Sequence, residues 1–91
     1  MIARNIMVEG HVQGVFFREW TLSKAREHSV TGWVRNRQDG RVEIYAVGQA
    51  PLVKRFVERL HEGSPASRVD RVDVQDAQIE RLDSFMRRQT V

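Results

Sequence analysis

Nine residues near the start of the chain, Gly10 to Arg18, constrain the fold more than any other stretch. Before them, apolar residues alternate with polar ones, as in a β-strand with one buried face. After them, apolar residues recur at spacings of three and four, as on one face of an α-helix. Gly10 and Gly14 mark a tight loop between the two periodicities. We therefore expect a strand, a glycine-bearing loop and a helix in direct succession.

The start of this helix lacks a residue that could cap it. No Ser, Thr, Asp or Asn stands between Gln13 and Phe17 to accept the first backbone N–H groups. Arg18 also places a cation at the positive end of the helix dipole, which costs a few tenths of a kcal/mol up to about 1. An anion in the loop would satisfy both the N–H groups and the guanidinium. A water-capped helix with a solvated arginine explains the same residues, so the loop alone leaves both interpretations open.

Length and composition bound the class of protein. The 91 residues suit a single domain spanning the chain, 1–91, with a core that needs no staples. The lack of cysteine excludes disulfides and thiolate metal sites and suits a reducing compartment. Since no signal-like start and no apolar run of membrane-spanning length is present, we expect a cytoplasmic protein without a membrane partner. The net charge of +3, with both signs interspersed, fits a small anionic ligand as well as nucleic acid.

The rest of the chain continues to switch between the two periodicities. Strands are expected at residues 3–9, 31–37, 42–47, 68–74 and 84–88, and helices at residues 18–28 and 51–62. The pair Asp39-Gly40 predicts a tight hairpin turn between the second and third strands. Apolar positions change parity between Val69 and Val72, which indicates a bulge or a late start of the fourth strand.

The order β-α-β-β-α-β, followed by a short extra C-terminal strand, predicts the fold class. It is typical of an α+β ferredoxin-like sandwich, in which an antiparallel sheet carries two helices on one face. Enzymes, RNA binders and regulatory domains all use this fold, so it does not determine function.

Three motifs stand out: Gly10-x-Val12-Gln13-Gly14-Val15-x-Phe17-Arg18, Gly32-Trp33-Val34-x-Asn36 and Asp39-Gly40-x-Val42-Glu43. Together they resemble the acylphosphatase family, and the first two are the most specific. The resemblance continues through the segment 63–69 to Phe85 and so covers nearly the whole chain. It implies an enzyme that hydrolyses the carboxyl–phosphate anhydride of acyl phosphates to a carboxylate and inorganic phosphate.

The resemblance also implies residue roles. In the family, the arginine that closes the loop binds the phosphoryl group, and it falls on Arg18. The asparagine at the end of the second strand positions the attacking water, and it falls on Asn36. The backbone amides that would cradle the phosphate oxygens are those of Val12, Gln13, Gly14, Val15 and Phe16.

These residue types suit the chemistry. A carboxylate is a good leaving group, so the protein has only to hold the phosphoryl oxygens, neutralise their charge and aim a water. A guanidinium binds two oxygens at once, and an amide side chain orients water without titrating. We expect no metal and no cofactor, a monomer, and inhibition by phosphate or sulfate.

Other polar and aromatic residues have two interpretations each. Asp39 could act as a general base, but an Asp before Gly more often serves a turn. His11 could face the phosphate or only occupy the loop, and the three histidines lack metal-ligand spacing. Trp20, Trp33 and Tyr45 could stack with bases, but we expect them to cover the core and the sheet.

Two features depart from the family pattern. His28-Ser29 stands where the family usually has Leu-Gly, so Ser29 is expected in a strained left-handed conformation and His28 in place of an apolar core residue. The chain also continues past the last expected strand as Gln89-Thr90-Val91, which we expect to fray.

Two further functions compete with the enzyme. One is an RNA-binding module of the same fold, although the third strand lacks the paired aromatic residues of such modules. The other is an anion-sensing domain that keeps the loop without catalysing hydrolysis; the presence of both Arg18 and Asn36 argues against it.

Overall fold

The structure, a computed structural model, describes residues 1–91. Its elements are β1 (Ile2–His11), α1 (Phe17–Glu27), β2 (Thr31–Asn36), β3 (Val42–Gly48), α2 (Ala50–Glu62), β4 (Arg68–Asp76) and β5 (Phe85–Arg87). Each predicted helix and strand is present, and its bounds differ from the prediction by at most two residues. Neither helix is both long and apolar enough to cross a membrane.

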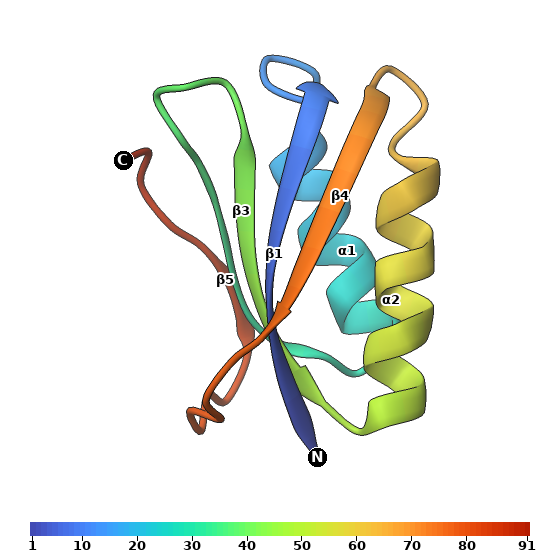
Figure 1. Ribbon diagram of the computed structural model, residues 1–91, viewed down its shortest axis with the longest axis vertical. Coiled ribbons are helices and arrows are strands. Elements are labelled where there is room, and N and C mark those ends of the chain that lie inside the picture. Colours follow the sequence, from blue (N-terminus) through green and yellow to red (C-terminus); the bar gives the residue numbers. More distant parts are fainter.

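The strands form one sheet in the order β4-β1-β3-β2-β5, with both helices on one face (Figure 1). The β1–β3, β1–β4 and β2–β3 pairs are antiparallel, as in the predicted ferredoxin-like α+β sandwich. β5 differs, because it pairs in parallel with β2. The sheet is therefore mixed, and this direction of β5 was not specified by the sequence pattern.

The main core lies between the sheet and the helices. α1 buries Phe17, Thr21 and Ala25, and α2 buries Val53, Phe56 and Leu60. These positions follow the helical spacing that predicted them, and each large apolar side chain contributes about 1.5–3 kcal/mol on burial. On β5, the buried ring of Phe85 meets Phe56 edge-on at a centroid distance of 5.9 Å. This contact fixes the C-terminal strand against the rest of the core.

A second, smaller cluster occupies the other face of the sheet. Trp33 and Tyr45 stack there with ring centroids 6.0 Å apart, and the segment 77–82 packs over them. The Tyr45 hydroxyl accepts the Glu80 N–H at 2.8 Å and donates to the Gln78 carbonyl. These two rings are buried, which confirms the interpretation as sheet cover and leaves them unavailable for stacking with bases.

The predicted irregularity of β4 is a bulge. Glu9 of β1 pairs with Arg71, whereas the next residue, Gly10, pairs with Val69, so Asp70 is the extra residue. Gly10 has φ 137°, and a Cβ there would lie 2.1 Å from the Arg68 carbonyl oxygen. Only glycine fits this approach, which lets β1 bend into the loop that follows.

The C-terminal residues are ordered, so the expectation of a frayed end is wrong. Arg88 N–H donates to the Val34 carbonyl at 2.8 Å, and Val91 N–H donates to the Asn36 carbonyl at 3.1 Å. Gln38 N–H in turn donates to the Val91 carbonyl at 2.7 Å. The tail therefore extends the β5–β2 pairing and ends beside the β2–β3 hairpin (Figure 1).

The end of α1 confirms the predicted strain. Ser29 has φ 57°, a left-handed conformation that glycine adopts at little cost and serine does not. Its side chain is exposed and makes no hydrogen bond. The neighbouring His28 is half-buried, and its Nε2 is buried without a partner. Ser29 through its backbone conformation and His28 through its unpaired Nε2 therefore each reduce the stability of the folded protein.

We expect Ser29→Gly to be neutral or to stabilise the protein by up to about 1 kcal/mol. Glycine relieves the left-handed strain, and the added freedom of the unfolded chain offsets part of the gain. The free energy of unfolding in urea measures this effect, with Ser23→Gly inside α1 as the control that should destabilise. A clear loss of stability in Ser29→Gly would contradict the assigned strain and show that the serine side chain stabilises the end of α1.

Candidate active site

A pocket of about 290 Å³ lies where the β1–α1 loop, the first turn of α1, the end of β2 and β5 meet. Its lining residues are Val12, Gln13, Gly14, Phe16, Phe17, Arg18, Glu19, Asn36 and Arg87. The fold thus brings Arg18 and Asn36, 18 positions apart in the sequence, to the same pocket. Of the predicted loop residues, only Val15 does not line it and instead packs partly buried against the core.

The helix start has the geometry that the sequence predicted. Phe16 is the N-cap of α1, in a left-handed conformation with φ 59° and ψ 26°, and no side chain caps the first turn. The N–H groups at a helix start have no partner within the helix, and they carry its partial positive charge. The loop and the first turn together therefore form a concave, donor-rich surface that suits an anion.

Arg18 stands in this first turn and lines the pocket. Its half-buried side chain makes no ion pair and no hydrogen bond within the protein, unlike most other arginines of the chain. All donors of its planar guanidinium therefore face no competing protein acceptor. Such a group can bind two oxygens of a phosphoryl group in parallel.

Asn36 is the last residue of β2, and its side chain lies on the same face of the sheet as that of the buried Val34. Its backbone is fixed by pairing with Val42 and by the bond from the tail. Its side-chain Oδ1 is buried and has no hydrogen-bond partner in the protein. An unpaired buried acceptor costs about 1–3 kcal/mol, so the carboxamide of Asn36 is held beside the pocket at a cost to the stability of the fold.

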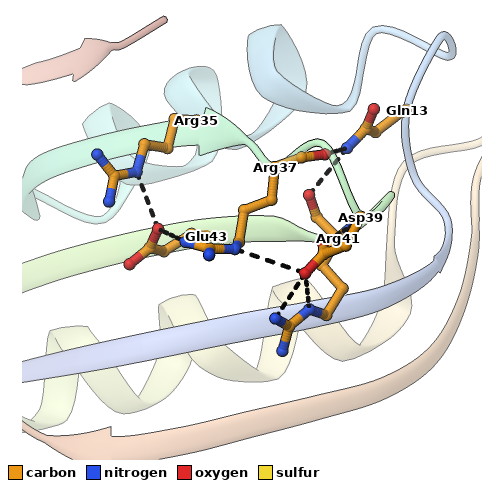
Figure 2. A network of polar contacts seen from close by, with 6 residues as sticks. All are labelled: Gln13, Arg35, Arg37, Asp39, Arg41 and Glu43. Atoms are coloured by element: carbon orange, nitrogen blue, oxygen red, sulfur yellow. Dashed lines mark hydrogen bonds and ion pairs between the residues drawn. The ribbon is translucent and has the colours of Figure 1, made fainter. Parts of the chain in front are cut away.

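Gln13 connects the loop to the β2–β3 hairpin through its side chain. Its Nε2 donates to the Arg37 carbonyl at 2.7 Å and to the Arg41 carbonyl at 2.9 Å (Figure 2). Because Arg37 directly follows Asn36, these bonds hold the loop at a fixed position relative to Asn36. The sequence predicted only a role for the backbone amide of Gln13.

An ionic network stiffens the base of the same hairpin (Figure 2). The carboxylate of Glu43 accepts from Arg35 at 2.8 Å and from Arg37 at 3.0 Å. Burial raises the pKa of Glu43, but the hydrogen bonds from the two arginines outweigh burial and hold that pKa below its ordinary value. Glu43 therefore stays ionised near neutral pH and pairs with both arginines, neither of which lines the pocket.

Asp39 stabilises the hairpin turn, as expected for an Asp that stands before a Gly. Its carboxylate accepts from the Arg41 backbone N–H at 3.1 Å and from the Arg41 guanidinium at 2.7 and 3.0 Å. These bonds, the side-chain bond first, lower the pKa of Asp39 to about 2. Asp39 does not line the pocket, and a carboxylate of such low pKa is a poor base near neutral pH.

Glu19 and Arg87 also line the pocket, and the sequence pattern did not predict them there. They form an ion pair between α1 and β5, and each side chain is about half exposed. The alternation of side chains along β5 could have indicated the position of Arg87. Arg87 lies on the same face of the strand as Phe85, which points into the core. Arg87 therefore comes to the helix side of the sheet, next to the strand that carries Asn36.

The histidines do not contribute to the pocket. His11 is exposed at the end of β1 and does not line it. No three side chains of His, Cys, Asp or Glu come together anywhere in a way that could hold a metal ion. The polar groups of the pocket are therefore the guanidinium of Arg18, the two carboxamides of Gln13 and Asn36, one ion pair and the backbone of the loop.

The chain matches the family model of the acylphosphatases over residues 4–86. It is 50% identical to an acylphosphatase of Rhizorhabdus wittichii over 90 residues, which are 99% of this chain and 91% of that protein. The crystal structure of acylphosphatase from Bacillus subtilis superposes with a TM-score of 0.92 at 40% identity, covering 94% of this chain and 97% of that chain. An acylphosphatase structure from Coxiella burnetii gives the same TM-score at 38% identity, with 96% and 92% covered. The chain therefore belongs to the acylphosphatase family.

Proposed function

We propose that the protein is an acylphosphatase in which Arg18 and the loop amides bind the phosphoryl group and Asn36 orients the attacking water. These roles rest on one observation: two residues that line the same pocket each have a polar group without a partner in the protein. Arg18 and Asn36 both line that pocket, the guanidinium of Arg18 pairs with no protein group, and the Oδ1 of Asn36 is buried without a hydrogen-bond partner. An acyl phosphate with one water satisfies both.

Binding uses fixed donors. The three terminal oxygens of the phosphoryl group would take the amides around Val12 to Phe16 and the two prongs of Arg18. These donors are held by a helix start and a tethered loop, so they need little reorganisation as charge shifts during the reaction. The Gln13 bonds to the hairpin support that rigidity.

Hydrolysis then needs one bond made and one broken. The water oxygen attacks phosphorus, and the bond from phosphorus to the acyl oxygen breaks, with its electron pair leaving on the carboxylate. The water proton passes to the phosphate product or to solvent. Asn36 orients the water through its carboxamide, and the activated leaving group requires no strong acid.

The test of this function is the turnover of benzoyl phosphate by the purified protein. We expect release of benzoate and inorganic phosphate in equal amounts, well above the rate in buffer at neutral pH. Phosphate and sulfate should inhibit competitively, because they present the same tetrahedral oxygens to the loop. A rate no higher than that of buffer would refute the enzymatic function and would favour the anion-sensing alternative if phosphate still bound.

We expect full activity after exhaustive treatment with a metal chelator. The groups proposed to act on the substrate are a guanidinium, backbone amides and a carboxamide, none of which needs a metal to be charged or polar. Initial rates on benzoyl phosphate before and after EDTA treatment and dialysis measure this. Loss of activity that zinc or magnesium restores would contradict the assignment.

We also propose that the enzyme works as a monomer in the cytoplasm. The pocket that one chain forms already brings together Arg18 and Asn36, the two residues to which we assign roles. The cysteine-free sequence suits a reducing compartment. Sedimentation of the purified protein at the mass of one chain, 10.6 kDa, is the expected result.

A further inference from the structure

Phe16 is an apolar side chain in an unusual place. It is 82% exposed, the highest value among the large hydrophobic residues, and it lines the pocket. It packs against neither hydrophobic cluster and makes no aromatic pair, whereas the adjacent Phe17 does both. Exposure of the ring forgoes the free energy of burial, and although single exposed apolar residues are common on protein surfaces, this one stands at the pocket.

The backbone at Phe16 adds to this cost. The residue is one of only two non-glycine residues with positive φ, at 59°. Bulky side chains rarely adopt this conformation, and strained residues of this kind cluster at ligand sites. The left-handed turn sends the ring outward, while the carbonyl of Phe16 still accepts the first helical hydrogen bond from Trp20 at 3.0 Å.

The pocket offers apolar surface to a ligand only at this ring. Its other two apolar lining residues, Val12 and Phe17, are each 1% exposed. The charged part of the lining outside Arg18 is the ion pair of Glu19 with Arg87, whose charges satisfy each other. A substrate whose phosphoryl group lies in the loop must extend its acyl group out of the pocket, and Phe16 is the exposed apolar group there.

We propose that the ring of Phe16 contacts the acyl group of the substrate and favours acyl phosphates whose acyl group is planar and apolar. This inference rests on the proposed function and extends it from the phosphoryl group to the remainder of the substrate. Contact with a flat acyl group removes apolar surface of both partners from water, and an aromatic acyl group adds ring–ring attraction. A small acyl group such as acetyl reaches little of the ring.

The test compares kcat/KM for benzoyl phosphate and acetyl phosphate, and its readout is the ratio of the two values. In Phe16→Ala, this ratio should fall about threefold to tenfold relative to wild type, as expected for loss of one aromatic contact. In Phe16→Tyr, which keeps the ring, the ratio should stay within about twofold of wild type. Any disturbance of the loop backbone affects both substrates and cancels in the ratio.

Ile79→Ala is the matched control, since Ile79 is an apolar residue 51% exposed that does not line the pocket. Its ratio should equal that of wild type. An unchanged ratio in Phe16→Ala, or a ratio in Phe16→Tyr as low as in Phe16→Ala, would refute the contact with the acyl group. If wild type hydrolyses neither substrate, the proposed function is wrong and this inference falls with it, an outcome distinct from activity on both with an unchanged ratio.

Discussion

Arg18→Ala should reduce hydrolysis of benzoyl phosphate to near the background rate and weaken phosphate binding at the same time. The guanidinium is proposed to hold the phosphoryl group before and during the reaction, so ground state and transition state lose the same contacts. Two charge-assisted hydrogen bonds are worth about 3–6 kcal/mol, which corresponds to a loss of roughly 10²- to 10⁴-fold in kcat/KM. Steady-state kinetics with phosphate as inhibitor measures both effects.

Two companion variants sharpen this experiment. Arg18→Lys should not restore activity, because a single ammonium cannot reproduce the two-pronged contact with the oxygens. Arg55→Ala removes an exposed arginine from α2 and leaves the pocket intact, so it controls for the change in net charge. Since Arg18 makes no hydrogen bond or ion pair in the protein, all three variants should fold normally. Activity of Arg18→Lys close to wild type would show that only the charge matters.

Asn36→Ala should lower kcat by roughly 10²-fold or more, about 3 kcal/mol, with phosphate affinity within a few-fold of wild type. The amide is proposed to touch the water, whose placement matters when it attacks, and not the phosphate. The fold should be unaffected, because the backbone of Asn36 carries its pairing with Val42 and its Oδ1 has no partner to lose.

Asn5→Ala is the matched control for this variant. Asn5 is an exposed asparagine of β1 that lies outside the pocket, so its removal should leave kcat unchanged. A fall in kcat of Asn36→Ala of less than about threefold would mean that the water is positioned by another group.

Most of the fold could be predicted from local patterns in the sequence. The alternation of Val42, Ile44 and Ala46 predicted β3, and the helical spacing of Phe17, Thr21 and Ala25 predicted the buried face of α1. These signals are strong because each depends on a period that one sheet or helix imposes on nearby residues. One further feature depended on the resemblance to the family, because the family pattern gave the reason to expect a left-handed Ser29.

What escaped prediction depends on residues far apart in the chain. Gln13 meets the hairpin carbonyls 24 and 28 residues later, and Glu19 pairs with Arg87 across 68 residues. Local periodicity does not report which side chains meet when the sheet closes. The parallel direction of β5 and the docking of Val91 on Asn36 arise in the same way, from the crossing of residues 77–84 over the sheet.

The separate roles proposed for Arg18 and Asn36 are tested most directly by the inhibition constant of phosphate. It is measured in parallel for wild type, Arg18→Ala and Asn36→Ala. We expect phosphate inhibition to be nearly abolished in Arg18→Ala and to remain within a few-fold of wild type in Asn36→Ala, although both variants turn over poorly. If Asn36→Ala loses phosphate affinity as severely as Arg18→Ala, then Asn36 is a phosphate ligand or a support of the loop, and its role with the water is wrong.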